Sequence, residues 1–320
     1  MALVDIQALN VSFPQHDSVV QAVRGMNLRV EAGESVGIVG ESGSGKSVTC
    51  MAALRLLRQP PARISASRMM LDGTDMLLAR PAALAAIRGR VAAMVFQDPM
   101  TAFDPVFTIG HQIVETIRAH RSLTQTEAKS EARALMERVR ITAPDGVLNS
   151  YPHQLSGGML QRAMIAMALS CRPKILFADE PTTALDVTIQ AQILALIKDL
   201  QAELGMGLVM VTHDLGVIAE TVDRVVVMYG GRVMEEGPVQ PLFDAPLHPY
   251  TRALLASVPG RVAGKRRLVE ISGASPNAAN PPPGCPFHPR CGLADAHCAA
   301  YAPDLTAAGD GRAAACWKLS

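Results

Sequence analysis

The strongest constraint on the fold is a glycine-rich octapeptide, Gly40-Glu-Ser-Gly-Ser-Gly-Lys-Ser47, which lies between two apolar segments. Ser35–Val39 before it is predicted to be a buried strand, and Lys46–Leu57 is predicted to be a helix that ends before Gln59-Pro60-Pro61. The octapeptide fits the pattern G-x-x-x-x-G-K-[ST], in which backbone N–H groups and a helix N-terminus converge on phosphate oxygens. A glycine-rich surface turn with a lysine is the alternative, but it would not require a strand before it and a helix after it. The sequence therefore predicts a phosphate-binding loop.

Strand and helix patterns alternate beyond this loop. The segments are Val91–Phe96 (strand), Ile109 to about Arg140 (helical), Ser156–Ser170 (helix), Lys174–Ala178 (strand), Thr188–Leu204 (helix), Gly207–Thr212 (strand) and Arg224–Met228 (strand). Strands separated by helices favour a mostly parallel α/β sheet, here with a helical insertion at about 98–165. Before the loop, residues 3–39 show only short apolar runs between turn residues.

Composition narrows the class of protein. The formal net charge is +1 with 18% charged residues and no long Lys/Arg run, so the sequence carries no electrostatic footprint for nucleic acid. No apolar run approaches the roughly 18–20 residues that span a bilayer, and the N-terminus has no basic segment followed by an apolar one. We therefore expect a cytosolic chain that would serve a membrane only through partners.

Two carboxylates stand where a predicted buried strand ends, in Ile175-Leu-Phe-Ala-Asp179-Glu180. Open α/β sheets bind ligands at the carboxyl ends of their strands. Asp179 is expected to hold Mg²⁺, directly or through water, and Glu180 to polarise an attacking water. Without the phosphate loop, a pair of solvated turn acids would be the better interpretation. In the loop itself, Lys46 is expected to reach the β- and γ-phosphates and the Ser47 hydroxyl to ligate Mg²⁺.

The octapeptide Leu155-Ser-Gly-Gly-Met-Leu-Gln-Arg162 precedes a long apolar helix pattern. Ser156, Gly157 and Gly158 at the start of that helix present a hydroxyl and unpaired backbone N–H groups to an anion. Taken alone, the same residues are an ordinary helix N-cap with flexible turn residues before it.

Together these motifs resemble those of ATP-binding cassette (ABC) ATPases, and the resemblance extends from residue 1 to about 240. Gln97 matches the family's Q-loop glutamine, which contacts Mg²⁺ and the water. Ala184-Leu185-Asp186 matches the D-loop, and His213 matches the switch histidine at the γ-phosphate. Phe13 lies where the family carries an aromatic residue that stacks on adenine, although a core phenylalanine would look the same.

The resemblance implies a P-loop NTPase fold of the ABC type, with an ATPase domain at 1–240 whose helical subdomain spans about 98–165. It implies ATP and Mg²⁺ as cofactors and Glu180, His213, Gln97 and Lys46 as catalytic residues. The residues implied at the nucleotide are Phe13, Gly40, Ser42, Gly43, Ser44, Gly45, Lys46, Ser47, Ser156, Gly157, Gly158 and Asp186. In this family the signature Ser156–Gly158 binds the nucleotide held by a second subunit, so the resemblance also implies a shared ATP site.

The residues around these motifs resemble those of the oligopeptide/dipeptide importer branch of the family. The similar segments are Gln97–Pro105, Pro152–Met159 and Pro181–Thr188. Leu247-His-Pro-Tyr250 resembles an element of that branch's C-terminal extension. Leu160 departs from the pattern, since a polar or basic residue is commoner there.

This branch implies a peripheral subunit on the cytoplasmic face of the membrane that couples ATP hydrolysis to uptake of di- or oligopeptides. It implies a second, non-identical ATPase subunit, two membrane-spanning permease subunits and, indirectly, an extracytoplasmic solute-binding protein. Nickel, glutathione or another small solute is the alternative cargo. A soluble ABC ATPase outside transport would be expected to bind nucleic acid and to carry a second cassette, a coiled-coil insertion or basic patches.

Residues 241–320 change character, with Pro, Ala and Gly in excess and four cysteines spaced C-x5-C-x6-C-x17-C. We expect an appended, irregular domain in which Cys285, Cys291, Cys298 and Cys316 hold a metal centre, since disulfides are rare in cytosolic chains. Structural zinc commonly uses C-x2-4-C pairs, whereas iron–sulfur clusters tolerate varied spacing. The resemblance implies a [4Fe-4S] cluster, with Zn²⁺ or unligated thiols as alternatives. The substitute ligands considered are His288 and His297, and the cysteines expected to be buried packing residues are Cys50 and Cys171.

Overall fold

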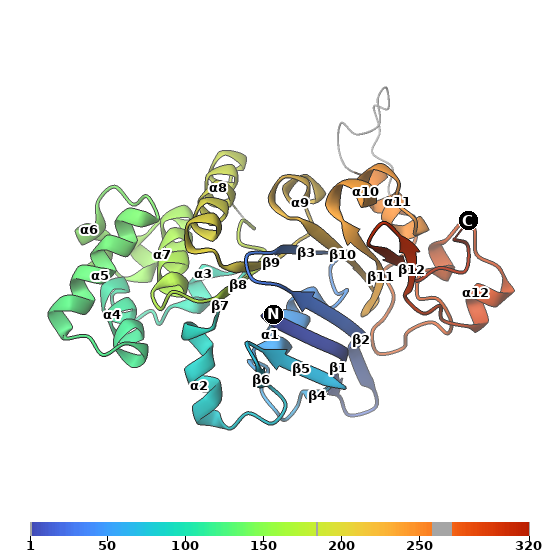
Figure 1. Ribbon diagram of the computed structural model, residues 1–320, viewed down its shortest axis with the longest axis horizontal. Coiled ribbons are helices and arrows are strands. Elements are labelled where there is room, and N and C mark those ends of the chain that lie inside the picture. The colour runs from blue at the N-terminus through green and yellow to red at the C-terminus, as the bar shows by residue number, and fades with distance from the viewer. Residues whose placement is uncertain (1, 184, 258–270, 320) are drawn as a thin grey trace. The chain divides into compact units, whose positions relative to one another are not determined.

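The computed structural model describes residues 2–183, 185–257 and 271–319, which form two compact units. Glu31–Glu34 and Leu78–Val209 make up the helical unit. Ala2–Val30, Ser35–Leu77 and Met210–Ser320 make up the sheet unit. Strand β9 (Gly207–Thr212) begins in the first and ends in the second. Figure 1 labels the elements of both units.

The sheet unit contains an antiparallel sheet in the order β2-β1-β5-β6, in which β4 also pairs with β1. Its strands are β1 (Val4–Pro14), β2 (Val19–Val30), β4 (Arg63–Ser65), β5 (Arg68–Leu71) and β6 (Thr74–Asp75). The two long strands are not evident from the sequence, where residues 3–39 read as short apolar runs. The reason is that the β1–β2 register shifts between Ile6 and Leu9 and again around Val11, so the period-two pattern breaks.

A second sheet in the same unit has the order β12-β13-β11-β10-β3, followed by the end of β9. Its strands are β3 (Ser35–Val39), β10 (Arg224–Tyr229), β11 (Arg232–Pro238), β12 (Thr306–Gly309) and β13 (Arg312–Ala314). β3 and β10 are parallel, but β10–β11, β11–β13 and β12–β13 are antiparallel. The predicted strands β3 and β10 are thus parallel as expected, and the sheet is mixed because β11 and the tail hairpin of β12 and β13, which were not predicted, add antiparallel strands.

The helices of the sheet unit are α1 (Lys46–Ala53), α9 (Leu215–Thr221), α10 (Val239–Asp244), α11 (Pro249–Ala256) and α12 (Ala296–Ala300). Two 3₁₀ turns occur at Pro152–Gln154 in the helical unit and at His288–Arg290 in the sheet unit. The helix α1 ends four residues before the predicted Leu57 because the chain turns at Leu54 and Arg55 takes a positive φ of 54°. Tyr229 and Tyr250 are among the largest fully buried side chains and belong to the core of this unit.

The helical unit carries the start of β9 followed by β8 (Ile175–Asp179) and β7 (Ala92–Val95). β7 and β8 pair in parallel, from Ala92 opposite Ile175 to Val95 opposite Ala178. All residues of both strands are buried, as expected for parallel strands covered on both faces.

Around these strands lie α2 (Pro81–Arg90), α3 (Pro99–Ala102), α4 (Ile109–His120), α5 (Gln125–Arg138), α6 (Pro144–Leu148), α7 (Gly157–Leu169) and α8 (Val187–Leu204). The single helical stretch predicted from Ile109 to about Arg140 is two helices. Thr124 starts the second one with a capping box, in which its side chain and that of Glu127 each bond the other's backbone N–H. In Figure 1, α4, α5 and α6 lie side by side at one end of this unit.

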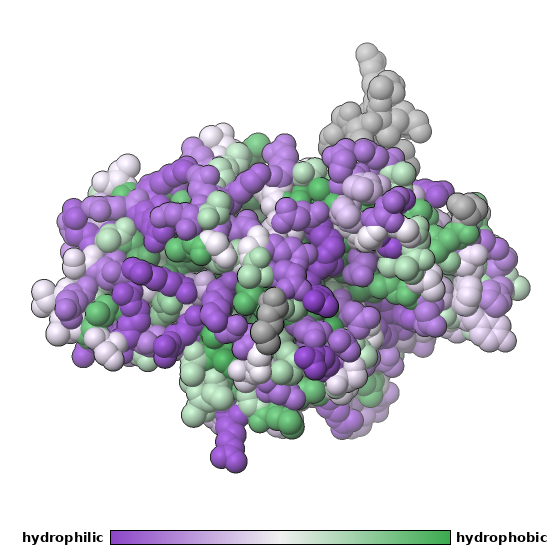
Figure 2. All heavy atoms as spheres, in the orientation of Figure 1, coloured by the Kyte–Doolittle hydropathy of each residue, from purple (hydrophilic) through white to green (hydrophobic). Residues whose placement is uncertain are grey.

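Hydrophilic and hydrophobic residues are interspersed on the face drawn in Figure 2. Among the described residues, no helix is both long enough and apolar enough to cross a bilayer.

The tail is less irregular than predicted, because β12 and β13 form a hairpin whose second strand joins β11, with Glu235 opposite Ala314 and Glu236 opposite Ala313. The hairpin turns at Asp310-Gly311, where both residues have a positive φ. An Asp-Gly pair between two short runs is a hairpin signal, so the sequence did contain an indication of this feature.

Candidate functional site

The phosphate loop connects the fully buried strand β3 to α1, as its sequence predicts. Gly40 has a φ of 151°, and a Cβ at this position would lie 2.1 Å from the carbonyl oxygen of Met228. Gly45, the residue before α1, has a φ of 102°, and its Cβ would lie 2.4 Å from the carbonyl oxygen of Ala22. The close backbone approach and the left-handed φ values both require glycine, which fixes the path of the loop.

Two buried side chains of the loop, Lys46 and Ser44, differ in their hydrogen bonds. The Nζ of Lys46, which is 5% exposed, donates to the carbonyl oxygens of Gly40 at 2.8 Å and Glu41 at 3.0 Å. The buried Oγ of Ser44 has no hydrogen-bond partner among the described residues. A buried hydroxyl without a partner is costly, so its place in a phosphate loop indicates a ligand oxygen as the missing partner. Ser42 and Gly43 are exposed, and Ser47 is half-buried in α1.

The carboxylates lie at the end of β8 in the helical unit. Asp179 is the last residue of the strand and is buried, and Glu180 follows it with a positive φ of 44°. The Nε2 of Gln97 donates to Glu180 Oε2 at 3.0 Å, and the Oγ1 of Thr183 donates to the same oxygen at 2.8 Å. The structure thus brings together Gln97 and Glu180, which are 83 residues apart in the sequence. Thr183 was not predicted from the sequence, where nothing distinguishes it from an ordinary turn residue.

The signature residues begin α7, as predicted. The Oγ of Ser156 accepts a long hydrogen bond of 3.4 Å from the backbone N–H of Met159, and both Ser156 and Gly157 are exposed. A Cβ on the half-buried Gly158 would come within 3.0 Å of Ile189 in α8. Leu160 is only 1% exposed, so it belongs to the core of the helical unit and not to the exposed face of the signature.

Three further predicted residues stand on other elements. Asp186 caps α8, its Oδ1 accepting from the backbone N–H of Ile189 at 2.9 Å. Ala184, two residues before it in the D-loop, lies outside the described residues. His213 is exposed between β9 and α9. Phe13, opposite Val20 near the end of β1, is half-exposed and so is not a core residue.

All four tail cysteines line one small cavity, together with Phe287, His288 and Trp317. Burial raises the pKa of the Cys285 and Cys316 thiols, and neighbouring thiols raise both further. The backbone N–H of Lys318 lies 3.3 Å from Cys316 Sγ, a contact that would stabilise a thiolate. Within the described residues, however, no group of three or more His, Cys, Asp or Glu side chains has the spacing of a metal site. The ligand chemistry of the cavity suits a thiolate-bound centre, because all four cysteines line it.

The other cysteines and histidines named in the sequence analysis differ in their surroundings. His288 lines the cavity and its Nδ1 lies 2.9 Å from the Cys285 carbonyl oxygen. His297 instead packs against Trp317, with ring centres 4.7 Å apart. Cys50 and Cys171 are buried, as expected of packing residues.

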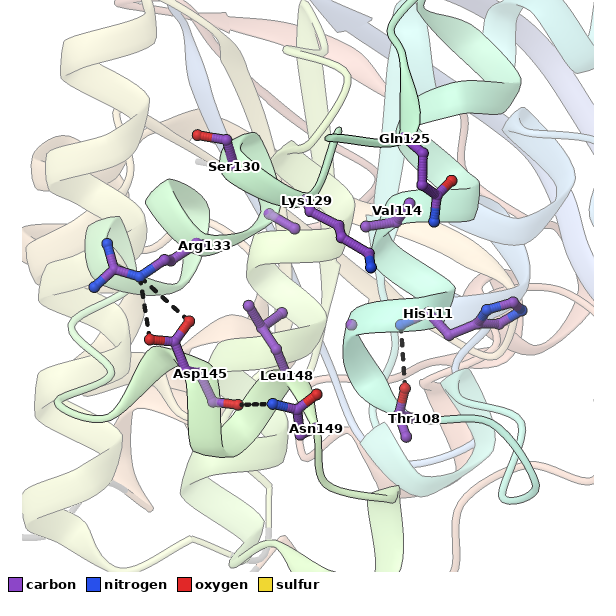
Figure 3. A pocket seen from close by; sticks show the side chains of 12 residues that line it. Thr108, His111, Val114, Gln125, Lys129, Ser130, Arg133, Asp145, Leu148 and Asn149 are labelled. Carbon is purple, nitrogen blue, oxygen red and sulfur yellow. Dashed lines mark hydrogen bonds and ion pairs between the residues drawn. The ribbon is translucent and has the colours of Figure 1, made fainter. Parts of the chain in front are cut away.

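The helical unit also holds a cavity of about 640 Å³ that the sequence did not indicate. Figure 3 shows it between α4, α5 and α6, with His111, Lys129 and Asp145 among its lining residues. The loop that leads into α4 exposes two apolar side chains, Val106 at 68% and Phe107 at 45%. An open cavity beside exposed apolar residues is typical of a surface that receives a partner.

Comparison with known families agrees with the motifs. The family model described as ABC transporter matches residues 23–183, and the model of the oligopeptide/dipeptide transporter C-terminal region matches residues 234–298. The solved structures of similar fold include the dimeric ATP-binding cassette MJ0796 bound to ADP and Pi, with a TM-score of 0.65 and 28% identity over 74% of this chain and 99% of that one. Another is cbiO1 of Clostridium perfringens, with a TM-score of 0.64 and 26% identity over 76% of this chain and 91% of that one.

Curated relatives extend the similarity to almost the whole chain. The "Probable peptide ABC transporter ATP-binding protein y4tR" of Sinorhizobium fredii is 49% identical over 99% of this chain and 95% of its own. The dipeptide transport ATP-binding protein DppD of Haemophilus influenzae is 46% identical over 95% and 92%. The glutathione import ATP-binding protein GsiA of Escherichia coli is 50% identical over 87% of this chain but only 46% of its own length. The chain therefore belongs to the ABC transporter family, as an ATP-hydrolysing, ATP-binding protein of the branch that carries the oligopeptide/dipeptide transporter C-terminal region.

Proposed function

We propose that the chain is the subunit that powers an importer of di- or oligopeptides, on the cytoplasmic face of the membrane. The observation that carries this is the C-terminal region at 234–298 together with near full-length similarity to proteins named for peptide and dipeptide transport. The ATPase domain would span 1–240, with its helical subdomain at about 98–165, and the transporter-specific domain would span 241–320.

In this proposal the phosphate loop binds MgATP. The backbone N–H groups of Gly43 and Gly45 and the Ser44 hydroxyl bind phosphate oxygens, Lys46 contacts the β- and γ-phosphates, and Ser47 faces Mg²⁺. Gly40 shapes the loop, Ser42 lines it and Phe13 stacks on the adenine. In the helical unit Asp179 and Gln97 serve the metal ion. The hydrogen bond from Gln97 to Glu180 supports a shared role around one water molecule.

Glu180 would polarise the attacking water, while His213 and Lys46 would stabilise the charge that develops on the γ-phosphate. The signature Ser156–Gly158 and the D-loop Asp186 would act on the nucleotide of a second ATPase subunit. The exposure of Ser156, Gly157 and Asp186 on the helical unit supports this, and the similar cassette MJ0796 was solved as a dimer. We infer that the second subunit is a related but non-identical cassette.

We propose that the cavity of Figure 3 receives one helix-like element, from one of two membrane-spanning permease subunits. Val106 and Phe107 supply apolar contact area, and the Arg133–Asp145 ion pair at 3.3 Å supplies charge at the rim. An extracytoplasmic solute-binding protein would act only through those permease subunits. Val106→Asp should abolish ATP-driven uptake while ATP binding persists, whereas Leu78→Asp, at an 80% exposed position, should leave uptake intact. Normal uptake by Val106→Asp would place the contact elsewhere.

Hydrolysis is tested by Glu180→Gln in the assembled transporter reconstituted in vesicles. We expect ATP binding to persist and turnover to fall about a hundredfold or more, because the general base is lost. The matched control is Glu115→Gln, whose carboxylate is 76% exposed on α4. Wild-type turnover in Glu180→Gln would remove Glu180 from the mechanism.

For the tail cavity we propose a [4Fe-4S] cluster held by Cys285, Cys291, Cys298 and Cys316, with Zn²⁺ as the alternative. The convergence of all four thiols on one cavity supports it. Bound there, a cluster would cross-link a segment that is poor in large apolar residues. Anaerobic purification should yield iron and acid-labile sulfide in equal amounts, lost in Cys285→Ser but not in Cys171→Ser. Stoichiometric zinc without iron would establish the alternative, and a metal-free protein would exclude both.

The residues of this chain do not select the cargo, because ATPase subunits do not contact it. The similarity to GsiA makes glutathione the second candidate, with nickel or another small solute as further alternatives. Uptake measured in vesicles with the matching solute-binding protein distinguishes these, since only one class of solute should stimulate ATP hydrolysis.

A further inference from the structure

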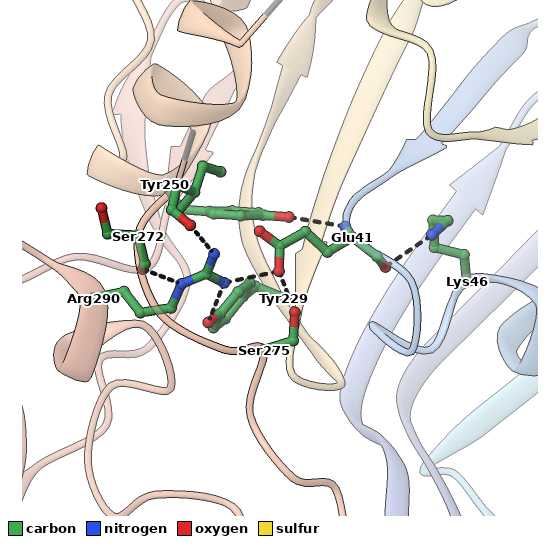
Figure 4. A network of polar contacts seen from close by, with 8 residues as sticks. Glu41, Lys46, Tyr229, Tyr250, Ser272, Ser275 and Arg290 are labelled. Atoms are coloured by element: carbon green, nitrogen blue, oxygen red, sulfur yellow. Dashed lines mark hydrogen bonds and ion pairs between the residues drawn. The ribbon is translucent and has the colours of Figure 1, made fainter. Parts of the chain in front are cut away.

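The phosphate loop is held in place by residues of the C-terminal region, and Glu41 is the point of contact. Arg290 Nη1 donates to Glu41 Oε2 at 2.8 Å, and the Ser275 hydroxyl donates to the same oxygen. The backbone N–H of Glu41 donates to the Tyr250 hydroxyl at 2.9 Å. Figure 4 shows that these side chains surround Glu41 on the side away from Lys46. Both the side chain and the backbone of one loop residue are therefore fixed by the tail.

Arg290 is itself held rigidly. Its Nη1 also donates to the Tyr229 hydroxyl at 3.0 Å, and its Nε and Nη2 donate to the carbonyl oxygens of Ser272 at 2.9 Å and Ile271 at 2.8 Å. The side chain is 6% exposed and that of Glu41 is 20% exposed. An ion pair that is sheltered from water and made by a side chain with three further hydrogen bonds holds its geometry better than an exposed ion pair does.

The backbone around Arg290 is also anchored. It ends the 3₁₀ turn His288–Arg290, which the backbone bonds from His288 N–H to Cys285 O and from Cys291 N–H to His288 O enclose. The N–H of Cys285 is bonded to the Cys298 carbonyl oxygen at 2.9 Å. The guanidinium of Arg290 therefore contacts the loop from a segment whose backbone is held by hydrogen bonds.

Glu41 matters because its carbonyl oxygen accepts from Lys46. If Lys46 turns to the phosphates when ATP binds, Glu41 loses that contact and its ties to Tyr250, Ser275 and Arg290 remain. We propose that Arg290 is a positioning residue for the phosphate loop: acting through Glu41, it sets the affinity of the loop for ATP. This inference rests on the proposed binding of ATP to the loop, and it assigns the C-terminal region a part in nucleotide binding.

The test is calorimetric titration of the full-length chain with MgATP. Arg290→Gln and Glu41→Gln should each weaken binding about tenfold, the size of effect expected for a charge-assisted bond that orders a site. If Arg290 acts through Glu41, the double variant should bind no more weakly than either single variant. Arg290→Lys keeps the charge and should recover part of the affinity. Tyr250→Phe, which removes the acceptor of the Glu41 N–H, should also weaken binding.

The matched control is Arg312→Gln, since Arg312 is another sheltered arginine of the tail, bonded to the Ala245 carbonyl oxygen and not to the loop. It should lower the melting temperature without changing the affinity for ATP. Wild-type affinity in Arg290→Gln, or additive losses in the double variant, would overturn the proposal. If Arg290→Gln does not fold, Arg290→Lys and Glu41→Gln decide by the same criterion. A wild-type chain that fails to bind MgATP would instead refute the proposed function itself.

Discussion

The buried imidazole of His248 should make the stability of the sheet unit depend on pH. His248 caps α11 and is 1% exposed, and its Nδ1 accepts from the backbone N–H of Tyr250 at 3.0 Å. Burial, reinforced by the positive charge of Arg252, lowers the pKa of His248 from 6.5 to about 4. A hydrogen bond with the backbone of Ala315 opposes this shift only weakly. The folded chain therefore favours the neutral ring.

The direction and size of the effect follow from linkage. Because the pKa is lower in the folded chain than in the unfolded one, the unfolded chain binds the additional proton between about pH 6.5 and pH 4. Above pH 6.5 the neutral His248 ring contributes fully to the free energy of unfolding, and this contribution is lost as the pH falls toward 4. The full pKa shift corresponds to about 3 kcal/mol of the free energy of unfolding, and about 2 kcal/mol of this is lost by pH 5.

Urea unfolding of the wild type and of His248→Asn at pH 7.5 and pH 5.0 measures this directly. Asparagine keeps a side-chain acceptor for the cap but does not titrate. The single tryptophan, Trp317, lies in the same region and donates to the Tyr301 carbonyl oxygen, so its fluorescence reports on unfolding there. The free-energy difference between the two proteins should shift by about 2 kcal/mol in favour of His248→Asn at pH 5.0.

The control for this experiment is Gln15→Asn, at an exposed position whose side chain does not titrate, so it should give the same difference at both pH values. Other groups that titrate in this range cancel between the wild type and each variant. A wild type to His248→Asn difference that stays constant within about 0.5 kcal/mol between the two pH values would refute the reasoning, since it would mean that the buried ring accepts its proton at no cost.

Three other outcomes are expected. Leu160→Ala should lower the free energy of unfolding by about 2–5 kcal/mol through the cavity it leaves, and Met159→Ala, on the same helix but 37% exposed, by less than about 1 kcal/mol. Glu235→Gln should cost about 2–3 kcal/mol in urea unfolding, because each oxygen of the fully buried carboxylate accepts one backbone N–H and the amide places an NH2 donor where one of these oxygens stood. Gly45→Ala should weaken MgATP binding about tenfold or more in a titration, because its Cβ would meet the Ala22 carbonyl oxygen, and unchanged affinity would show that the loop adapts.

The strands whose bounds the sequence predicted correctly are buried along their whole length. Ser35–Val39 and Gly207–Thr212 have the predicted bounds because every residue in them is buried and polar or glycine residues stand at their ends. The helix starts were also predictable where a cap marks them, as at Ser156. In these cases the bounds of the element depend on neighbouring residues, which the sequence gives directly.

What could not be predicted is set by contacts between distant residues. The bond between Arg290 and Glu41 joins residues 249 apart in the sequence, and no pattern near either of them indicates it. The bond between Gln97 and Glu180 was approached only through a family resemblance that assigns both to one reaction. The strand β1 was missed because its register shifts displace the buried residues from alternation. In each case the missing information is a tertiary pairing and not a propensity.

Leu160 shows how such a pairing changes the meaning of a sequence departure. Within the signature octapeptide, Ser156 and Gly157 are exposed, whereas Leu160 and Gln161 are 1% and 2% exposed. The octapeptide therefore serves two purposes, with its first residues available to a nucleotide and its later ones packed in the helical unit. A leucine in place of a polar residue at 160 alters the packed part only. Leu160→Ala should consequently lower stability and leave the KM for ATP of the assembled transporter unchanged, and a raised KM with normal stability would contradict this division.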